Sequence, residues 1–280
     1  MINTDKKVWF ITGASRGLGK EIVVAALEAG DSVVAGVRNI TKANDLPKND
    51  QLIVVQLDVT QQAQAQKAVE TAMNHFGRID VVINNAGYGL LGAVEETSAE
   101  QVRDIFATNV EGPLNVIRAA LPILRQQSSG HIINISSLGG FAASAGNGVY
   151  GASKFAIEGI SEALEKEVKH CGIKVTLIEP GMFRTEFLSG KSIQIAAKQF
   201  TEYDRVINRN RAKEAHGSQL GDPKKAAAVI REVVSLASPP LRLPLGEDAV
   251  KRVRDKLNYV EQELELYRSM SLSTNFEQNL

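Results

Sequence analysis

The chain reads Val8-Trp-Phe-Ile-Thr-Gly-Ala-Ser-Arg-Gly-Leu-Gly19 near its start, and this stretch decides the fold. Four apolar residues predict a buried strand, and the pattern after them predicts a helix from Gly17 to Ala29 that stops at Gly30. Glycines between a strand and a helix let the backbone approach a pyrophosphate closely, and the helix start offers unpaired N–H groups. The spacing Gly-x-x-x-Gly-x-Gly differs from the fingerprint Gly-x-Gly-x-x-Gly, and a tight turn alone would also need glycine. The flanking strand and helix favour a nucleotide-binding loop.

Short apolar runs alternate with helical patterns along most of the remaining chain. Further strands are expected over 32–37, 52–57, 79–83, 131–135 and 174–178, and helices over 61–75, 99–107, 112–126, 149–169 and 223–236. Near-continuous Val, Ile and Leu runs are typical of parallel strands that are buried on both faces. The expected fold class is therefore α/β, a Rossmann-type doubly wound parallel sheet of about seven strands with helices on both faces, in a single domain over 1–280.

The pattern changes after Pro180-Gly181. Residues 185–221 are polar, charged and helix-prone, and we expect them to form a helical lid over a substrate site. The run 241–245 is a possible edge strand, because its proline cannot donate to a central ladder. An amphipathic C-terminal helix is expected over 246–268, followed by a frayed tail over 271–280.

Composition argues against several classes of function. Lys plus Arg and Asp plus Glu both number 32, so the formal net charge is zero and nothing points to nucleic acid or to an anionic membrane. No apolar run approaches the ~20 residues of a membrane helix, and the polar N-terminus does not resemble a signal peptide, so we expect a cytoplasmic protein. One cysteine permits no intramolecular disulfide, and four scattered histidines predict no metal site.

The end of the second predicted strand bears on the choice between NAD and NADP. A site for NAD usually has an acidic residue there, which binds the ribose 2′-hydroxyl. Here the chain reads Val37-Arg38-Asn39, and the Arg38 guanidinium is a planar donor fork suited to a phosphate. Arg16, in the glycine loop, is a second cation nearby. Solvated surface arginines would give the same pattern, but we predict NADP(H) as the cofactor, with NAD(H) as the alternative.

Two turns after predicted strands extend this nucleotide site. Asp58-Val59 follows the third strand, where the carboxylate would accept a hydrogen bond from an adenine amino group or cap the next helix. Asn84-Asn-Ala-Gly87 follows the fourth strand and combines amide side chains with a turn glycine, although a plain strand-ending turn would look the same.

Tyr150-Gly-Ala-Ser-Lys154 places a phenol and an ammonium four residues apart in a predicted helix, where residues i and i+4 share one face. A free tyrosine has a pKa of about 10, too high for proton transfer near neutrality. A neighbouring positive charge favours the phenolate and lowers that pKa. The pair is common by chance in soluble helices, so its weight comes from the motifs that precede it.

Five motifs occur in a fixed order: Thr-Gly-x-x-x-Gly-x-Gly at 12–19, Asn-Asn-Ala-Gly at 84–87, Ile-Ser-Ser at 135–137, Tyr-x-x-x-Lys at 150–154 and Pro-Gly at 180–181. With these motifs the chain resembles a short-chain dehydrogenase/reductase of the single-domain, NADP(H)-preferring type, over roughly residues 6–190. The 13-residue separation of Ser137 and Tyr150 agrees with the pattern of that family.

The resemblance implies a catalytic tetrad. Asn109 would hold a water on a proton relay, and Ser137 would bind the substrate oxygen. Tyr150 would protonate a carbonyl or deprotonate an alcohol, and Lys154 would bind the nicotinamide ribose and lower the Tyr150 pKa. The residues expected to bind the cofactor are Gly13, Ser15, Arg16, Gly17, Leu18, Gly19, Arg38, Asp58, Val59, Asn85, Ala86, Gly87, Tyr150, Lys154, Pro180, Gly181 and Thr185.

We therefore expect an NADP(H)-dependent enzyme that interconverts a carbonyl and an alcohol of a small molecule, in a homodimer or homotetramer built on 112–126 and 149–169. Apolar residues beside the motifs suggest an apolar ketone, aldehyde or secondary alcohol, although core packing would explain them equally; they are Leu138, Phe141, Met182, Phe183, Phe187 and Leu188. The alternatives are a catalytically silent NADP-binding regulator, a sugar-nucleotide epimerase or dehydratase, and an enoyl reductase. The intact tetrad argues against a silent regulator. The glycine spacing argues against an epimerase or dehydratase, and the Tyr–Lys spacing argues against an enoyl reductase.

Overall fold

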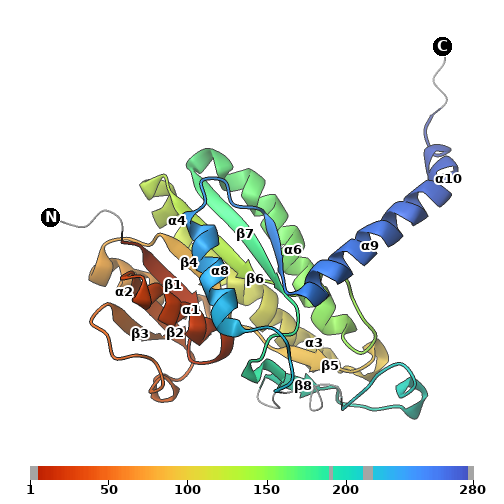
Figure 1. Ribbon diagram of the computed structural model, residues 1–280, viewed down its shortest axis with the longest axis horizontal. Helices are drawn as coiled ribbons and strands as arrows, with labels where there is room; N and C mark the ends of the chain where they lie inside the picture. Colours follow the sequence, from red (N-terminus) through yellow and green to blue (C-terminus); the bar gives the residue numbers. More distant parts are fainter. Residues whose placement is uncertain (1–5, 189–191, 211–216, 277–280) are drawn as a thin grey trace.

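The structure is a computed structural model that describes residues 6–188, 192–210 and 217–276. A seven-stranded parallel sheet forms its centre, in the order β3-β2-β1-β4-β6-β7-β9 (Figure 1). The strands are β1 (Val8–Thr12), β2 (Ser32–Val37), β3 (Leu52–Gln56), β4 (Val81–Asn84), β6 (Gly130–Ile135), β7 (Ile173–Pro180) and β9 (Arg242–Leu245). The chain runs outward from β1 to β3 and then returns to β4 on the other side of β1. The predicted doubly wound parallel sheet is confirmed, and its switch point lies between β1 and β4, where such sheets bind ligands.

Helices cover both faces of the sheet. One face carries α2 (Gln62–Phe76), α4 (Gly112–Gln127) and α6 (Gly148–Val168), and the other carries α1 (Gly17–Glu28) and α8 (Pro223–Ser235). Neighbouring residues of one strand belong to different cores: Phe10 and Ile132 pack with α2 and α4, whereas Trp9 and Ile133 pack with α1 and α8. Both faces are buried, which is why these strands are apolar almost throughout.

Local signals set the helix ends. Gly77, with φ of +73°, ends α2 in the left-handed conformation, and its N–H donates to the carbonyl of Met73 at 2.8 Å. The Asp222 carboxylate caps α8 by accepting from the N–H of Lys224 at 2.8 Å, and Pro223 occupies the first helical position. These caps are readable in the sequence, and the predicted bounds of both helices hold to about one residue.

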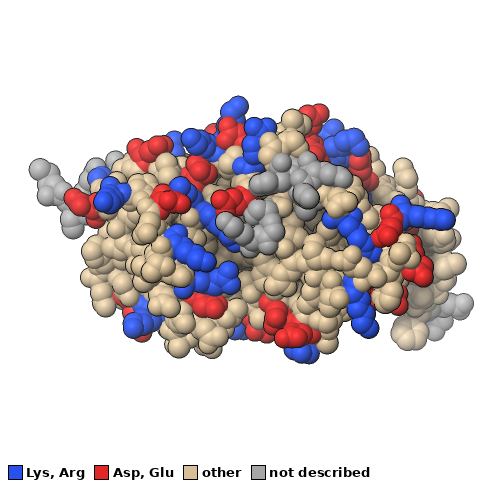
Figure 2. All heavy atoms as spheres, turned by 90° about the horizontal axis from the view of Figure 1, so that it is seen from below, with Lys and Arg blue, Asp and Glu red and all other residues tan. Residues whose placement is uncertain are grey.

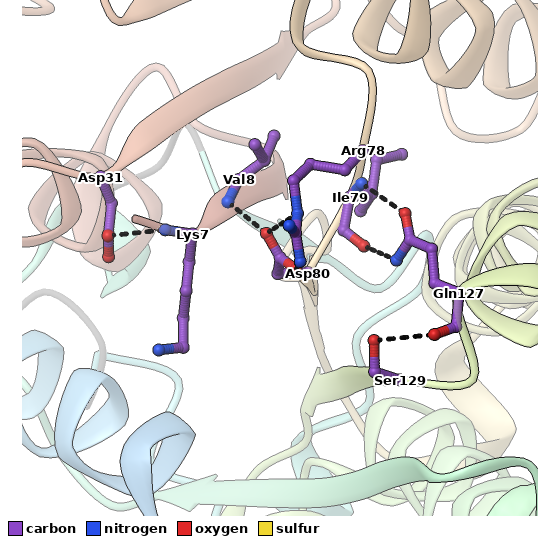
Figure 3. A network of polar contacts seen from close by, with 8 residues as sticks. All are labelled: Lys7, Val8, Asp31, Arg78, Ile79, Asp80, Gln127 and Ser129. Atoms are coloured by element: carbon purple, nitrogen blue, oxygen red, sulfur yellow. Dashed lines mark hydrogen bonds and ion pairs between the residues drawn. The ribbon is translucent and has the colours of Figure 1, made fainter. Parts of the chain in front are cut away.

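Side chains tie together the amino ends of the strands, at the edge of the sheet remote from the switch point (Figure 3). The Asp80 carboxylate accepts from the backbone N–H of Val8 at 2.8 Å and from the Arg78 guanidinium at 2.6 Å. The Gln127 side chain accepts from the N–H of Ile79 at 3.2 Å and donates to its carbonyl at 2.6 Å. This network fixes β1 and β4 to each other and to α4.

The helical lid expected over 185–221 is not what the structure shows in the described part of that segment. The segment contains the single 3-10 turns η5 (Glu186–Leu188) and η6 (Thr201–Tyr203) and the strand β8 (Ile193–Ile195); positions 189–191 and 211–216 lie outside the described residues. β8 pairs in parallel with β5 (Gly89–Leu91), a short strand that the sequence did not predict. Arg209 anchors the segment through a 2.6 Å ion pair to the buried Glu96. Tertiary pairing therefore overrides helix propensity here.

The C-terminal part begins with β9, which pairs only with β7 and is an edge strand, as its proline predicts. α9 (Glu247–Leu266) then projects away from the body, and α10 (Arg268–Leu272) continues it, so the expected tail is helical as far as Leu272 (Figure 1). The remaining elements are η1 (Ile40–Lys42), η2 (Val94–Glu96), α3 (Ala99–Phe106), the π-helical turn η3 (Ala107–Glu111), α5 (Leu138–Phe141) and η4 (Lys169–Cys171).

The surface gives two general findings. On the face seen in Figure 2, lysine and arginine side chains are interspersed with acidic ones, as the zero formal net charge leads one to expect. Within the described ranges, no helix is both long and apolar enough to cross a membrane.

Candidate active site

A cleft of about 1800 Å³ opens at the carboxyl ends of the central strands. A pocket for one small ligand has about 300–1,000 Å³, so this cleft has room for a dinucleotide together with a second molecule. Most of the residues predicted for the site line it: Gly13, Ser15, Arg16, Gly17, Leu18, Arg38, Asp58, Val59, Asn85, Ala86, Gly87, Ser137, Tyr150, Lys154, Pro180, Gly181 and Thr185. Gly19 and Asn109 are buried behind the cleft wall.

The glycine loop needs its glycines for close packing. Gly13 has φ of +63°, and a Cβ there would lie 2.9 Å from the Ala86 backbone. A Cβ on Gly19 would collide with the Asn85 side chain. The first turn of α1 has no side-chain cap and no acidic residue, so its N–H groups suit a phosphate.

Thr12, the first residue of the motif at 12–19, holds this loop, a role that was not predicted from the sequence. Its hydroxyl accepts from the backbone N–H groups of Asn85 and Ala86, both at 3.0 Å. The Asn85 amide donates to the carbonyls of Thr12 and Gly13 at 3.0 and 3.1 Å. The Asn-Asn-Ala-Gly turn therefore fastens β4 to the glycine loop, and Asn85 supports the loop from behind.

The region beyond β2 carries the residues predicted to select the cofactor. Arg38 is exposed at the cleft edge, and its guanidinium makes no hydrogen bond with the described part of the chain. Arg16 lies 4.0 Å from the Glu186 carboxylate, so an ion pair already holds it beside the glycine loop. The Asp58 carboxylate accepts from the N–H and the hydroxyl of Thr60 at 3.0 and 2.8 Å. It closes a turn before α2 and is not the helix cap.

Asn109 owes its position to the π-helical turn between α3 and α4. The sequence predicts two separate helices, but the turn joins them and directs the Asn109 side chain inward, where it is 1% exposed. The Asn109 amide donates to the Tyr88 carbonyl at 2.9 Å and to the Ser153 hydroxyl at 3.1 Å, and its carbonyl accepts from the Tyr88 N–H at 3.1 Å. π-turns of this kind are frequent at functional sites. Asn109 thereby links the Asn-Asn-Ala-Gly turn to α6.

Ser137 and Tyr150 lie close to each other in the wall of the cleft. The Ser137 hydroxyl oxygen accepts from the N–H of Gly139 at 3.0 Å, which caps α5. Burial raises the pKa of the Tyr150 phenol above its usual value, and the neighbouring Ser137 hydroxyl opposes this effect only in part. The lowering of the Tyr150 pKa that the Lys154 spacing predicts is thus opposite to the direction found here. The Lys154 ammonium instead donates to the carbonyl of Ile135 at 2.8 Å.

A buried ionic cluster lies behind Lys154, and sequence reasoning missed it. Glu158, one turn further along α6, accepts from the Arg242 guanidinium at 2.9 Å, and Glu179 lies 3.8 Å from the same guanidinium. Burial lowers the pKa of Lys154 to about 8, and the Glu158 charge opposes this effect. Burial and the Glu158 charge raise the pKa of Glu179 to about 7. Two signals were available: Glu158 follows Lys154 by four residues, and Glu179 interrupts an apolar strand.

The other end of the cleft is largely apolar. Of the residues suggested to surround the substrate, Leu138, Met182, Phe183, Phe187 and Leu188 line the cleft and Phe141 does not. The Phe187 ring centroid is 6.1 Å from that of Tyr150, so an apolar wall stands beside the phenol. Asp248 and Arg252, from the start of α9, are charged members of this wall. Thr185 accepts from the N–H of Phe187 at 3.2 Å and starts the turn that carries it.

Known proteins are similar to this chain in sequence and in fold. The chain is 39% identical over 273 residues to Oxidoreductase BOA17 of Botryotinia fuckeliana, covering 96% of this chain and 99% of that protein. It is 38% identical over 241 residues to a 3-ketodihydrosphingosine reductase of Bacteroides thetaiotaomicron, covering 86% and 88%. The crystal structure of a short-chain dehydrogenase from Streptomyces avermitilis matches with a TM-score of 0.90 at 39% identity, over 97% of this chain and all of that one. More distant structures contain NAD or NADP.

The model of one protein family, described as short chain dehydrogenase, matches residues 7–195. This match spans the glycine loop, the Asn-Asn-Ala-Gly turn and the Ser137–Tyr150 pair, which the structure gathers around one cleft. The chain therefore belongs to the short-chain dehydrogenase/reductase family of oxidoreductases.

Proposed function

We propose that this chain is an NADP(H)-dependent oxidoreductase that reduces a carbonyl to an alcohol, or runs the reverse reaction. The observation that carries the proposal is that Ser137, Tyr150 and Lys154 line the same cleft, which has room for two ligands, with the Ser137 hydroxyl and the Tyr150 ring both next to Gly139. The phenol of Tyr150 has an O–H that can leave as a proton. The Ser137 oxygen accepts from the Gly139 N–H, so the Ser137 O–H remains available to donate to a substrate oxygen.

The residues around the cleft fit a nicotinamide dinucleotide. The glycine loop and the start of α1 would hold the pyrophosphate, and Arg38 would bind the 2′-phosphate of NADP. Lys154 uses one of its three donors on Ile135, which leaves two for ribose hydroxyls. When bound, the cofactor supplies the hydride for reduction or accepts it in oxidation.

The chain's own residues handle the oxygen and the proton. In reduction, Ser137 donates a hydrogen bond to the carbonyl oxygen and stabilises its developing negative charge. Tyr150 transfers its proton to that oxygen, and the cation of Lys154, one turn further along α6, stabilises the phenolate left behind. In oxidation the same phenol oxygen takes the proton from the alcohol. Asn109, fixed by Tyr88 and Ser153, holds the turn that forms the cleft floor.

We propose an apolar ketone, aldehyde or secondary alcohol as the substrate. Phe187 and Leu138 flank Tyr150 with apolar surface, and the described part of 185–221 walls this side of the cleft. A relative named 3-ketodihydrosphingosine reductase supports a ketone substrate. The alternative function is that of a catalytically silent regulatory protein, which would bind the cofactor without turnover.

A substrate panel tests the proposal. Purified protein is assayed with NADPH and with NADH against ketones, aldehydes and enoyl thioesters, and cofactor binding is measured in parallel. We expect turnover of apolar ketones or aldehydes with NADPH and none of the enoyl thioesters. Tight NADPH binding with no turnover in either direction would identify a regulator and overturn the enzymatic proposal.

A further inference from the structure

Apolar side chains of α9 lie where the described chain covers them little or not at all. The helix leaves the body beside β9 and extends away from it (Figure 1). Leu257, Val260 and Leu264 are 55%, 46% and 59% exposed. Of the seventeen large hydrophobic residues left exposed in the described structure, ten lie between Val250 and Phe276. Exposed apolar surface that is concentrated on one element marks an interaction site.

The spacing of these residues indicates what covers them. Separations of three and four residues alternate along the series Val250, Val253, Leu257, Val260, Leu264 and Tyr267. A mean spacing of 3.5 residues is the repeat of a coiled-coil seam, in which each residue inserts between residues of another helix. The seam runs along nearly the whole of α9 and therefore calls for a second helix of similar length.

The charges beside the seam suit a second copy of this same helix. Arg254 and Lys256 flank its first half, and Glu261 and Glu263 flank its second half, all four at the positions next to the apolar seam. In an antiparallel pair of identical helices, Leu257 of each copy lies opposite Val260 of the other. The basic half of each copy then lies opposite the acidic half of the other, and such flanking pairs set partner choice.

The body presents this helix in a fixed direction. The Asp248 carboxylate accepts from the N–H of Met182 at 2.8 Å, and the Arg252 guanidinium donates to the carbonyl of Ala143 at 2.8 Å. Along the helix, Lys251 forms a 2.7 Å ion pair with Asp255 on the side away from the seam. A helix already held in its bound conformation loses less entropy on docking than a flexible tail.

We propose that α9 binds the α9 of a second copy of this chain through the seam from Val250 to Tyr267. The pairing is isologous, so the same face serves both copies and the contact closes on itself. It is independent of the proposed reaction, since the seam lies outside the cleft, and it differs from the 112–126 and 149–169 surfaces suggested by family resemblance.

Matched substitutions test the seam. Val260→Glu with Leu264→Glu places two carboxylates in it, whereas Asn258→Glu with Gln262→Glu adds the same charge to the exposed outer face. Molar mass is measured by light scattering and sedimentation, with circular dichroism as the check on folding. We expect the seam variant to have half the mass of the wild-type assembly and the outer-face variant to keep it. A monomeric wild type, or a seam variant with unchanged mass, would overturn the proposal.

Charge reversal tests the partner. One variant carries Arg254→Glu and Lys256→Glu, and the other carries Glu261→Lys and Glu263→Lys. Each alone places like charges opposite each other, so we expect each to lose half the wild-type mass. An equimolar mixture restores opposite charges on both sides and should regain that mass. A mixture that stays dissociated would show that the partner is not a second α9.

Discussion

At the level of single residues, the proposed reaction depends on the phenol of Tyr150. Tyr150→Phe keeps the ring beside Phe187 but removes the hydroxyl and with it the proton. We expect kcat to fall about 10²- to 10⁴-fold, the usual contribution of a general acid, while the Kd for NADPH changes only a few-fold. Steady-state kinetics and cofactor fluorescence measure the two quantities. Tyr88→Phe, which removes another phenol hydroxyl from the cleft, should keep kcat within a few-fold; an active Tyr150→Phe enzyme would exclude Tyr150 as the acid.

Glu179 makes a second prediction, on stability. Its pKa is raised from 4.5 to about 7 in the folded protein, mainly by burial and then by the Glu158 charge. A raised pKa means that the folded state prefers protonated Glu179, so the associated stability is fully present below pH 4.5 and is lost as the pH rises to about 7. Glu179→Gln, which stays neutral, should therefore become more stable relative to wild type across this window, by up to roughly 3 kcal/mol.

Urea unfolding from pH 4 to pH 8 measures this difference, and Glu162→Gln is the matched control. Glu162 also pairs with Arg242, at 3.0 Å, but its pKa is lowered, mainly by the hydrogen bond from Arg242. The stability that ionised Glu162 contributes is present at high pH and is lost on acidification. Relative to wild type, Glu162→Gln should therefore become less stable as the pH rises, whereas Glu179→Gln should become more stable. A pH-independent difference between Glu179→Gln and wild type would show that folding does not shift the pKa of Glu179.

At the level of elements, the amino ends of β1 and β4 are held by Asp80. Asp80→Ala leaves the Val8 N–H without its acceptor, so we expect a loss of about 1–3 kcal/mol in the free energy of unfolding. Arg78→Ala removes the ion pair but keeps that acceptor; because the Arg78 side chain is 50% exposed, its loss should cost under about 1 kcal/mol. Urea unfolding compares the two variants, and equal losses would place the stabilisation in the ion pair. Neither variant should alter cofactor binding at the other end of the strands.

The elements that the sequence predicted are those whose signals are local. β1, β2 and α1 follow from apolar runs, a glycine loop and a glycine stop, and each lies where periodicity places it. β5 and β8 have three residues each and form because they pair with each other. Gly89 pairs with Ile193, for example, although 103 residues separate them in the sequence. Such pairing has no local signature, so the segment around β8 was predicted as helix on propensity alone.

The site shows the same division. Ser137, Tyr150 and Lys154 belong to sequence motifs, and the fold brings them to one cleft, Ser137 from the end of β6 and the other two from α6. The direction of the Tyr150 pKa could not be predicted, since burial decides it and burial depends on the whole fold. Glu179 and Arg242 come from separate strands, and only the pairing of β7 with β9 places them together.

At the level of the whole molecule, two segments meet over the cleft. The first part of the chain builds the nucleotide side, and residues from Pro180 onward build much of the substrate side, including Asp248 at the base of α9. Asp248 packs against Gly181, where any Cβ would strike its carboxylate. The helix proposed to join two copies thus starts at the wall of the cleft, although its seam lies outside the cleft.

Cofactor binding should be visible in the stability of the whole chain. A ligand at 100 times its Kd stabilises the folded state by about 2.7 kcal/mol, and 1 kcal/mol raises Tm by about 2–4 °C in chains of 150–250 residues. We therefore expect NADPH to raise Tm by roughly 5–10 °C and NADH by less at the same concentration. Arg38→Asp removes the donor fork and adds a carboxylate that suits a ribose 2′-hydroxyl, so the order of the two cofactors should reverse. Arg231→Asp, on the exposed side of α8, is the control and should leave the Tm shifts of both cofactors unchanged. If NADPH still raised the Tm of the Arg38→Asp protein more than NADH does, Arg38 would not be part of the cofactor site.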